Sequence, residues 1–450
     1  MRVHNSLTRR IEDLVPIADN EIRLYTCGPT VYNFAHIGNF RAYAFEDVLR
    51  RTILFNGMKI RQVMNLTDVD DKTIRGANAA GVPLQDYTKT YKDAFFADLK
   101  TLNIQPAEVY PAATDHIPEM IALVERLVEK GVAYKSDDGS VYFGVRKFPG
   151  YGKLAHIDFD NQRTGARCAA DEYDKENVGD FALWKAWEPS DGPVGWDSPW
   201  GRGRPGWHIE CSAMSMKYLG ETFDLHTGGI DNLFPHHENE IAQAEAATGK
   251  PFVKTWMHCA HLRVNGEKMS KSLGNFYTLR DLMEKGWSGR EIRYVLVNAH
   301  YRSGLNFAFD ALEDARRSLE RIDRCVAKAT EGAVPAWAAA RLDEFSAAVN
   351  DDLNMPKAFA ALFALVRDAN VNGAEGTLGV FRRMDEVLGV IFFGAKAADD
   401  IPADVQAMLD ARAAARAERN WAESDRLRDA IAAAGWVVTD SKSGQSCVRR

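Results

Sequence analysis

The alternation of apolar and polar positions near the start of the chain predicts a strand, a helix and a second strand. Residues 22–26 (IRLYT) form a short strand pattern, residues 27–39 are turn-rich, and residues 59–66 form a second strand pattern. Between the strands, apolar residues recur at helical spacing, namely Phe45, Val48, Leu49 and Phe55. Such a βαβ unit belongs to a parallel sheet, and ligands bind beyond the carboxyl ends of its strands. We therefore expect chemistry in residues 27–39.

The middle of the chain changes pattern twice. Residues 84–135 have helical spacing, and residues 139–195 are irregular, with a hairpin-like SVYFGV and closely spaced tryptophans. We interpret residues 116–200 as an insertion into the catalytic domain. Strand-like sequence resumes over residues 207–273, which predicts the second half of the sheet.

The last third of the chain is predicted to be mostly helical. Ser288 and Glu291 have the form of a capping box, and Pro356 stands as the first residue of a later helix. One apolar stripe has heptad-like spacing, formed by Leu312, Ala315, Leu319, Ile322 and Val326. Residues 392–404 have the composition of a linker, followed by helices near 405–419 and 421–434 and a strand at 436–439.

These patterns predict an α/β fold: a Rossmann-type parallel-sheet catalytic domain with an insertion, then a helical bundle and a small C-terminal mixed α/β domain. The expected domains are a first catalytic half, the insertion, a second catalytic half, the bundle and the C-terminal unit, at 1–115, 116–200, 201–285, 286–395 and 396–450.

The composition is that of a globular protein, with 46% hydrophobic and 26% charged residues among 450. Apolar runs stay shorter than the roughly 18 residues of a membrane span, and the start of the sequence lacks a secretory pattern, so we expect a cytoplasmic protein with no membrane partner. Six scattered cysteines without a C-x-x-C pair favour free thiols or metal ligands. The net charge of −7 argues against nucleic-acid binding over the whole surface.

A first group of residues has the character of a phosphate site. His36, Gly38 and Asn39 lie in the motif HIGN, where the turn after the first strand meets the start of a helix. Glycine lets a ligand approach the backbone, the helix start offers free N–H groups, and histidine can donate to a phosphate oxygen. A histidine in a turn is more often structural, so this motif needs support from elsewhere in the chain.

A second group lies in residues 266–275 (GEKMSKSLGN). Lys268 and Lys271 are three positions apart, with Ser270 between them, and a mobile loop of this kind can bring two cations onto a triphosphate. The sequence lacks the G-x-x-x-x-G-K-[ST] pattern of a Walker loop. By itself, a pair of lysines in a polar loop also fits a solvated surface.

A third group has the residue types of a zinc site. Cys27 ends the first strand, Cys211 follows a Gly- and Pro-rich approach, and His236 and Glu240 share one helix face if Pro235 begins a helix. Two thiolates, an imidazole and a carboxylate make a four-ligand set for zinc. The residues alone leave open that both cysteines are small buried side chains and that His236 and Glu240 form an ordinary helix pair.

HIGN followed by KMSKS resembles the two signature motifs of class I aminoacyl-tRNA synthetases, with Asn39 where the usual motif ends in histidine. Asparagine keeps a donor amide but carries no charge, which puts a cationic role of position 39 in doubt. The segments LYTCGPTVYNFAHIGN, NLTDVDDK, GRPGWHIECS and FPHHENE narrow the resemblance to the cysteinyl-tRNA synthetase family. This resemblance covers the chain from about residue 20 onward.

The resemblance implies one zinc ion per chain at Cys27, Cys211, His236 and Glu240, where it binds the substrate thiol. It also implies that Trp207 and Thr67 contact L-cysteine, that Asp231 lies in the same pocket beside ATP, and that Mg²⁺ accompanies ATP. His36, Lys268 and Lys271 are then the catalytic residues, and Gly38, Asn39 and Ser270 complete the nucleotide contacts. A monomer is expected.

The C-terminal residues are expected to bind tRNA(Cys). Residues 401–450 carry eight Lys and Arg against seven Asp and Glu, a mild contrast with the acidic whole. The resemblance implies an anticodon-binding domain in which four residues contact RNA, namely Arg416, Trp421, Asp425 and Asp440. Unpaired bases in loops are the usual targets of sequence-specific RNA contacts. The alternative is that Trp421 is a core residue and Asp425 a solvated one.

The physical reason for such a metal site is the near identity of cysteine and serine. An apolar pocket separates substrates that differ by one group by only about 10–200-fold. Zinc prefers a soft thiolate to a hydroxyl, so selection at the binding step needs no editing domain. The implied function is ATP-dependent ligation of cysteine to tRNA(Cys). Two alternatives stay open: a cysteine ligase that acts on a small-molecule amine, as in mycothiol synthesis, and a non-catalytic paralogue.

Overall fold

The computed structural model describes residues 1–157, 179–269, 274–394, 402–441 and 444–449. The chain forms two compact units, Met1–Phe393 and Gly394–Arg450. No helix among the described residues is long and apolar enough to cross a membrane.

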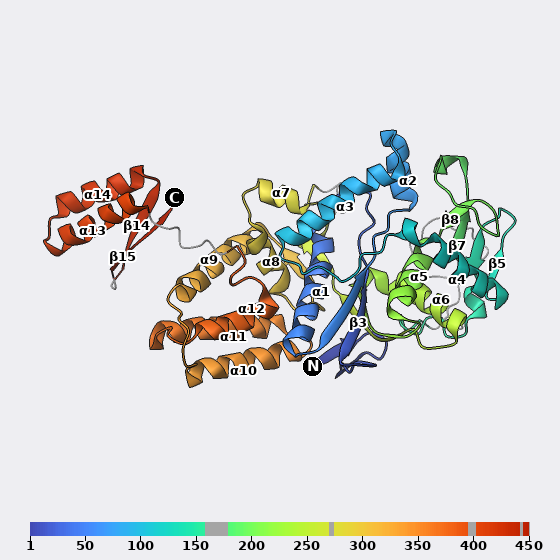
Figure 1. Cartoon of the computed structure of the whole chain (residues 1–450), viewed down its shortest axis with the longest axis horizontal. Helices are drawn as coiled ribbons and strands as arrows, with labels where there is room; N and C mark the ends of the chain where they lie inside the picture. Colours follow the sequence, from blue (N-terminus) through green and yellow to red (C-terminus); the bar gives the residue numbers. More distant parts are fainter. Residues whose placement is uncertain (158–178, 270–273, 395–401, 442–443, 450) are drawn as a thin grey trace. The chain divides into compact units, whose positions relative to one another are not determined.

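A parallel sheet of four strands, in the order β10-β9-β3-β4, lies at the centre of the first unit (Figure 1). The strands are β3 (Glu21–Thr26), β4 (Lys59–Met64), β9 (Phe223–Gly229) and β10 (Val253–Cys259). Helix α1 (Ile37–Phe55) connects β3 to β4, so the predicted strand–helix–strand unit is confirmed. The segment after α3 adds two parallel bridges beyond β4, Val63 to Val109 and Leu66 to Ala112.

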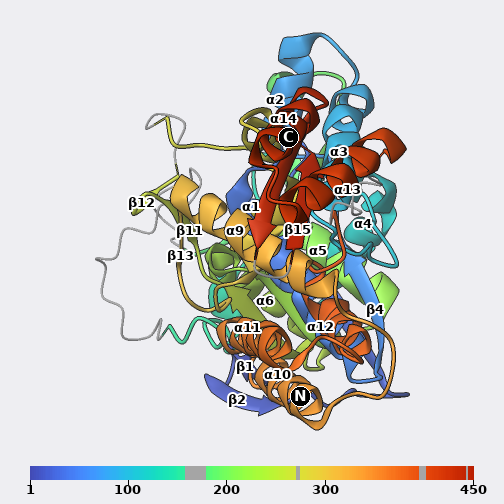
Figure 2. The same ribbon diagram turned by 90° about the vertical axis from the view of Figure 1, so that its left-hand side faces the viewer.

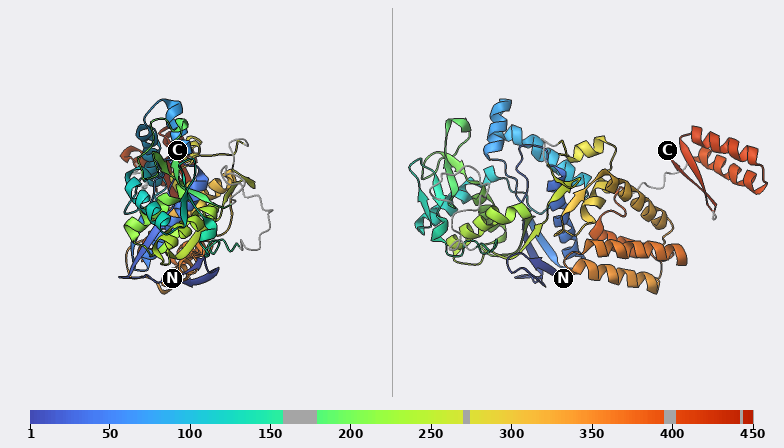
Figure 3. Two further views of the ribbon diagram at one scale, coloured as in Figure 1. Left: turned by 90° about the vertical axis from the view of Figure 1, so that its right-hand side faces the viewer. Right: turned by 180° about the vertical axis from the view of Figure 1, so that it is seen from behind.

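The residues around the central sheet form helices and an antiparallel insertion. Helices α2 (Asp71–Ala80), α3 (Leu84–Thr101) and α4 (Ile117–Glu129) follow β4. A second sheet of four antiparallel strands comes next, made of β5 (Ala133–Lys135), β6 (Val141–Phe143), β7 (Phe181–Ala186) and β8 (Gly203–Pro205). Figure 3 shows it beside the green helices α5 (Trp207–Leu219) and α6 (Glu238–Thr248). A hairpin of β1 (Arg2–Asn5) and β2 (Arg10–Asp13) precedes the central sheet.

The strand-like prediction over residues 207–273 is wrong at Trp207–Leu219, which is helix α5. Helix α6 (Glu238–Thr248) follows Pro235, where the sequence analysis considered a helix start. Both helices are buried around most of their surface, so their sequences lack the polar face that reveals an amphipathic helix. The strands β9 and β10 that flank α6 agree with the prediction.

A three-stranded sheet, in the order β12-β11-β13, and a helical bundle follow the central sheet (Figure 2). The strands are β11 (Leu262–Val264), β12 (Glu267–Lys268) and β13 (Leu305–Phe307), and the helices are α7 (Leu279–Glu284), α8 (Gly289–Val297), α9 (Phe309–Val326), α10 (Ala336–Asn350), α11 (Met355–Asn372) and α12 (Leu378–Leu388). The capping box of Ser288 and Glu291 is confirmed at α8. The stripe on α9 is buried as expected, except that Cys325 takes the place of Val326. Helix α11 begins one residue before Pro356, and α10 was not predicted.

The second unit is a pair of helices with a hairpin. Its elements are α13 (Ala403–Ala417), α14 (Trp421–Ala433), β14 (Trp436–Ser441) and β15 (Gly444–Arg449). Val405, Leu409, Ile431 and Trp436 form its small core. Both predicted helices and the strand are present, and β15 is an additional strand that pairs with β14.

Candidate active site and metal centre

The side chains of His36 and Asn39 cap the start of α1 through reciprocal hydrogen bonds. His36 is the residue before the helix; its Nδ1 accepts from the backbone N–H of Asn39 at 3.2 Å, and Asn39 Oδ1 accepts from the backbone N–H of His36 at 3.1 Å. Because Nδ1 accepts, the ring proton lies on Nε2. Burial lowers the pKa of His36, which keeps the ring neutral at pH 7. Asn39 is therefore a cap of the helix rather than a cationic contact.

Gly38 and the segment after the lysine loop complete this corner. A Cβ on Gly38 would lie 2.9 Å from the ring of His36, so only glycine fits without a shift of that ring. Ile37 donates its backbone N–H to Tyr277 O at 3.0 Å, which attaches the exit of the lysine loop to the start of α1. Lys268 ends β12, where only its backbone is described, and Ser270 and Lys271 lie outside the described residues.

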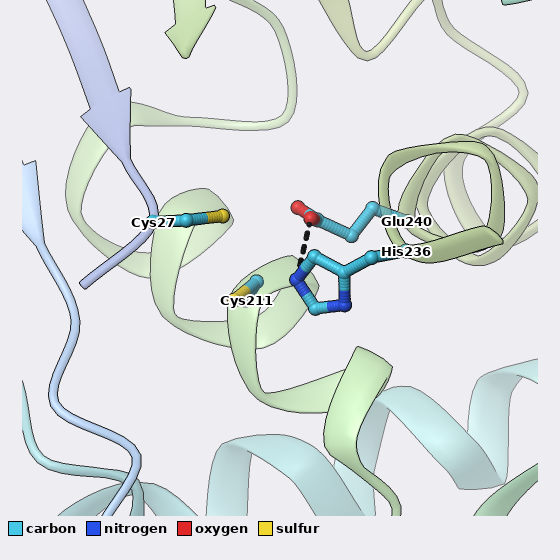
Figure 4. A group of neighbouring side chains, drawn as sticks. All are labelled: Cys27, Cys211, His236 and Glu240. Atoms are coloured by element: carbon cyan, nitrogen blue, oxygen red, sulfur yellow. Dashed lines mark ion pairs between the residues drawn. The ribbon is translucent and has the colours of Figure 1, made fainter. Parts of the chain in front are cut away.

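The four predicted metal ligands come together although they belong to three separate segments (Figure 4). Cys27 follows β3, Cys211 lies in α5, and His236 and Glu240 flank the start of α6. One ligand atom from each lies within 4.8 Å of the others. Within Leu233–His237 only Phe234 departs from helical backbone angles (φ −142°, ψ 133°), and Glu238 donates its backbone N–H to Pro235 O. A helical turn from Pro235 therefore leads into α6, as expected, and places His236 and Glu240 on one side.

The donor set fits a zinc ion. His236 Nε2 lies 3.1 Å from Glu240 Oε1, but not in the direction of a hydrogen bond, so this fully buried oxygen has no hydrogen-bond partner among the described residues. The other oxygen of Glu240 faces His226 Nε2 at 2.9 Å, and His236 Nδ1 lies 2.8 Å from His208 Nδ1. Two sulfurs, one nitrogen and one oxygen are ordinary zinc donors, held here by outer side chains.

A second group of four in the same place consists of Cys27, His226, His237 and Glu240. His226 Nε2 is already paired with Glu240, so His226 fits as an outer support rather than as a ligand. His237 Nδ1 lies 2.9 Å from His258 Nε2 and its Nε2 lies 3.3 Å from Cys27 Sγ, so His237 turns its second nitrogen to the cluster as His236 does. His208, His226 and His258 were not predicted, because they lie far apart in the sequence and in no recognisable spacing.

Burial favours the uncharged forms of the cluster's side chains. It lowers the pKa of His236 well below its ordinary value, so the imidazole is a neutral donor. The hydrogen bond to Cys211 and burial raise the pKa of Cys27, which disfavours the thiolate. A divalent cation reverses this preference, because it pairs with thiolates and displaces their protons.

Of the predicted substrate residues, Trp207 contacts this cluster directly. Trp207 is 39% exposed, and its ring stacks on that of His236 at a centroid distance of 4.1 Å. Asp231 is exposed in the short turn Ile230–Asn232 that follows β9. Thr67 is only 1% exposed, and its hydroxyl contacts other side chains.

The three aspartates of NLTDVDDK have structural partners rather than an arrangement for magnesium. Asp70 caps α2, and Asp68 accepts from Lys92 and from Thr114. Asp71 pairs with Lys185 at 3.0 Å.

The second unit exposes two of the predicted RNA contacts, Trp421 and Asp425. Trp421 is 57% exposed at the first position of α14, and the guanidinium carbon of Arg416 lies 5.7 Å from its ring centroid. Asp425 pairs with Arg428 at 3.1 Å. Asp440 belongs to β14, where its side chain is not described. Trp421 is therefore not a core residue of this unit.

Residues 13–317 match the family model described as "tRNA synthetases class I (C) catalytic domain". The Cysteine--tRNA ligase of Protochlamydia amoebophila (strain UWE25) is 52% identical over 99% of this chain and 97% of its own length. The chain belongs to the cysteine–tRNA ligase family. The corresponding family member of Chlamydia muridarum is 47% identical, over 98% of both chains.

Two further family models match later parts of this cysteine–tRNA ligase family member. Residues 344–393 match a DALR domain, and residues 398–447 match a cysteinyl-tRNA ligase anticodon binding domain. Among solved structures, the methionyl-tRNA synthetase of Mycobacterium tuberculosis in complex with methionyl-adenylate has a TM-score of 0.59 at 15% identity, over 82% of this chain and 88% of that chain. This likeness shows the class I fold.

Proposed function

We propose that this protein is a cysteine–tRNA ligase, which activates L-cysteine with ATP and transfers it to the 3′ end of tRNA(Cys). The observation that carries the proposal is the placement of the cluster of Cys27, Cys211, His236 and Glu240. It lies at the carboxyl end of β3, on the same edge of the sheet as the capped start of α1. A thiol site thus adjoins a phosphate site, as the activation of cysteine requires.

We propose that the cluster holds one zinc ion per chain. When bound there, zinc would accept the substrate thiolate as a soft ligand and would bind the hydroxyl of serine poorly. Trp207, stacked on His236, would then cover the side chain of the amino acid. This arrangement selects the thiol by chemistry rather than by shape, which matches the small size difference between the two amino acids.

In the activation step, the carboxylate of cysteine attacks the α-phosphorus of MgATP and pyrophosphate leaves. The Nε2–H of His36 and the backbone N–H of Gly38 are donors toward the phosphates, since the N–H groups of Ile37 and Asn39 are already bonded. Lys268 and Lys271 would close over the β and γ groups, with Gly38 and Ser270 allowing close approach and Asp231 beside the nucleotide. Catalysis here is positioning and charge stabilisation rather than covalent chemistry.

In the transfer step, the terminal ribose hydroxyl of tRNA(Cys) takes the cysteinyl group from the adenylate. We assign no protein base to this step. The second unit would recognise the anticodon, with Trp421 stacking on an unpaired base and Arg416, Asp425 and Asp440 reading base edges. Its match to the anticodon binding domain supports this role.

The test measures ATP–pyrophosphate exchange and tRNA charging for the wild-type protein and for Lys271→Ala. We expect cysteine-dependent exchange and charging in the wild type, and a large loss of the exchange rate with nearly unchanged cysteine affinity in the variant. Normal exchange by Lys271→Ala would refute the role of that lysine. Cysteine activation without charging of tRNA would indicate a small-molecule ligase, and absence of activation would indicate a binding paralogue.

A further inference from the structure

Three buried polar side chains lie between the two segments that carry the cysteines. Asn65 and Thr67 follow β4, and Glu210 lies in the first turns of α5. Their exposed fractions are 2%, 1% and 0%. Buried polar groups are costly unless they are paired, so their arrangement calls for an explanation.

The three side chains form one continuous line of hydrogen bonds. The backbone N–H of Gly28, next to Cys27, donates to Asn65 Oδ1 at 2.9 Å. Asn65 Nδ2 donates to Thr67 Oγ1 at 3.2 Å, and Thr67 Oγ1 donates to Glu210 Oε2 at 2.9 Å. Glu210 directly precedes Cys211.

Backbone hydrogen bonds also hold the segment of Cys27 against residues 65–67. Thr67 donates its N–H to Pro29 O at 3.1 Å and accepts from the N–H of Val31 at 3.0 Å. A Cβ on Gly28 would lie only 1.7 Å from Asn65 O, so the two segments are in direct contact. The segment of Cys27 is thereby fixed to residues 65–67.

We infer that Asn65, Thr67 and Glu210 form a bridge that sets the spacing of the Cys27 and Cys211 thiols, and that Thr67 and Glu210 are positioning residues of the metal site. The inference rests on the proposed function, because it assumes that the cluster holds zinc. It gives Thr67 a role other than the predicted contact with cysteine, since its hydroxyl proton goes to Glu210.

The direction of each hydrogen bond makes the bridge depend on the middle hydroxyl. Thr67 accepts from Asn65 and donates to Glu210, and valine has the same shape but can do neither. Glu210 Oε1 has no hydrogen-bond partner among the described residues, so loss of the Thr67 contact would leave both of its buried oxygens unpaired. Glu210 would then be expected to shift, and Cys211 would move with it.

The test measures zinc binding by chelator competition on the full chain, without substrates, together with the visible spectrum of the Co²⁺-loaded protein. Outer hydrogen bonds around a metal site contribute about 10–100-fold to affinity. We expect Thr67→Val to lower zinc affinity by about this factor and to change the cobalt bands. Thr67→Ser keeps the hydroxyl and should restore both to near wild type.

A second pair of variants separates the bridge from the charge of Glu210. Glu210→Gln still accepts from Thr67 and should bind zinc nearly as the wild type does, whereas Glu210→Met should bind weakly. Equal weakening in both variants would overturn the bridge in favour of a purely electrostatic role.

The matched control is Thr52→Val, which makes the same change at a fully buried threonine within α1, where the hydroxyl donates to Val48 O. It should leave zinc affinity unchanged. Wild-type zinc affinity and cobalt bands in Thr67→Val, with only the KM for cysteine raised, would overturn the bridge and restore the substrate contact. A wild-type protein that binds zinc but charges no tRNA would refute the proposed function and leave this comparison intact.

Discussion

Replacement of Arg293 by methionine is expected to destabilise the catalytic unit severely. Arg293 lies in α8 and is fully buried. Its Nη2 lies 2.6 Å from Asp47 Oδ2 in α1, and its other nitrogens donate to Leu388 O at 3.0 Å, Leu102 O at 3.1 Å and Asn103 O at 3.2 Å. One guanidinium thus joins α1, α8 and the ends of α3 and α12.

The size of the expected loss of stability follows from the charge of Asp47, which the substitution leaves without Arg293. Asp47 is fully buried, and removal of one partner from a buried ion pair costs about 3–5 kcal/mol. Arg51 remains 2.7 Å from Asp47, which moderates the loss. We therefore expect about 4 kcal/mol, or about a thousandfold in the folding equilibrium.

The assay is equilibrium urea unfolding followed by circular dichroism. The control is Arg317→Met, which removes a side chain that is 67% exposed and pairs with an equally exposed Asp314. Exposed pairs contribute about 0–1 kcal/mol, so this variant should stay near wild type. An Arg293→Met protein within about 1 kcal/mol of the control would refute the reasoning. In the double variant Arg293→Met with Asp47→Leu, the loss of unfolding free energy should be smaller than the sum of the losses in the two single variants.

Three more changes test separate parts of the site. Gly28→Ala should lower zinc content, because its Cβ would lie 1.7 Å from Asn65 O; Gly379→Ala, with open space around the new Cβ, should not. His36→Asn keeps a helix cap without a titrating ring. Because the pKa of His36 is lowered in the folded protein, its contribution to stability is complete above the unfolded pKa of about 6.5 and is lost as the pH falls below that value. Between pH 7.5 and pH 5.5, the wild type should therefore lose more unfolding free energy than His36→Asn. Trp421 is 57% exposed, so Trp421→Ala should remove about 1–3 kcal/mol of base stacking from tRNA binding and reduce tRNA charging accordingly. Pyrophosphate exchange should stay unchanged. An equal loss in both assays would contradict the anticodon role.

The parts of the fold with periodic apolar spacing were predictable because each has a buried face and a more exposed face. Helix α1 and strands β3 and β4 follow their apolar spacing, and α9 buries the predicted stripe almost unchanged. Helix α5 was missed because it is buried on most sides, which removes the contrast that periodicity depends on. The sequence of a helix buried in this way does not distinguish it from a buried strand, because both are apolar runs.

The ligand set of the site was predictable from motifs, whereas its supports were not. Cys27, Cys211, His236 and Glu240 stand in recognisable segments, and the structure brings them together. His208 and His226 contact that set only through the fold. The role of Asn39 became clear only from its hydrogen bond with His36.

The central claim is that a metal at the cluster selects cysteine over serine. The most direct measurement is ATP–pyrophosphate exchange with each amino acid, on protein whose zinc content has been quantified, before and after removal of the metal by a chelator. We predict one zinc per chain and a preference for cysteine far above the roughly 200-fold limit of an apolar pocket. This preference should be lost when the metal is removed and regained when zinc is restored. A preference within that limit, or one that survives complete removal of the metal, would contradict the claim.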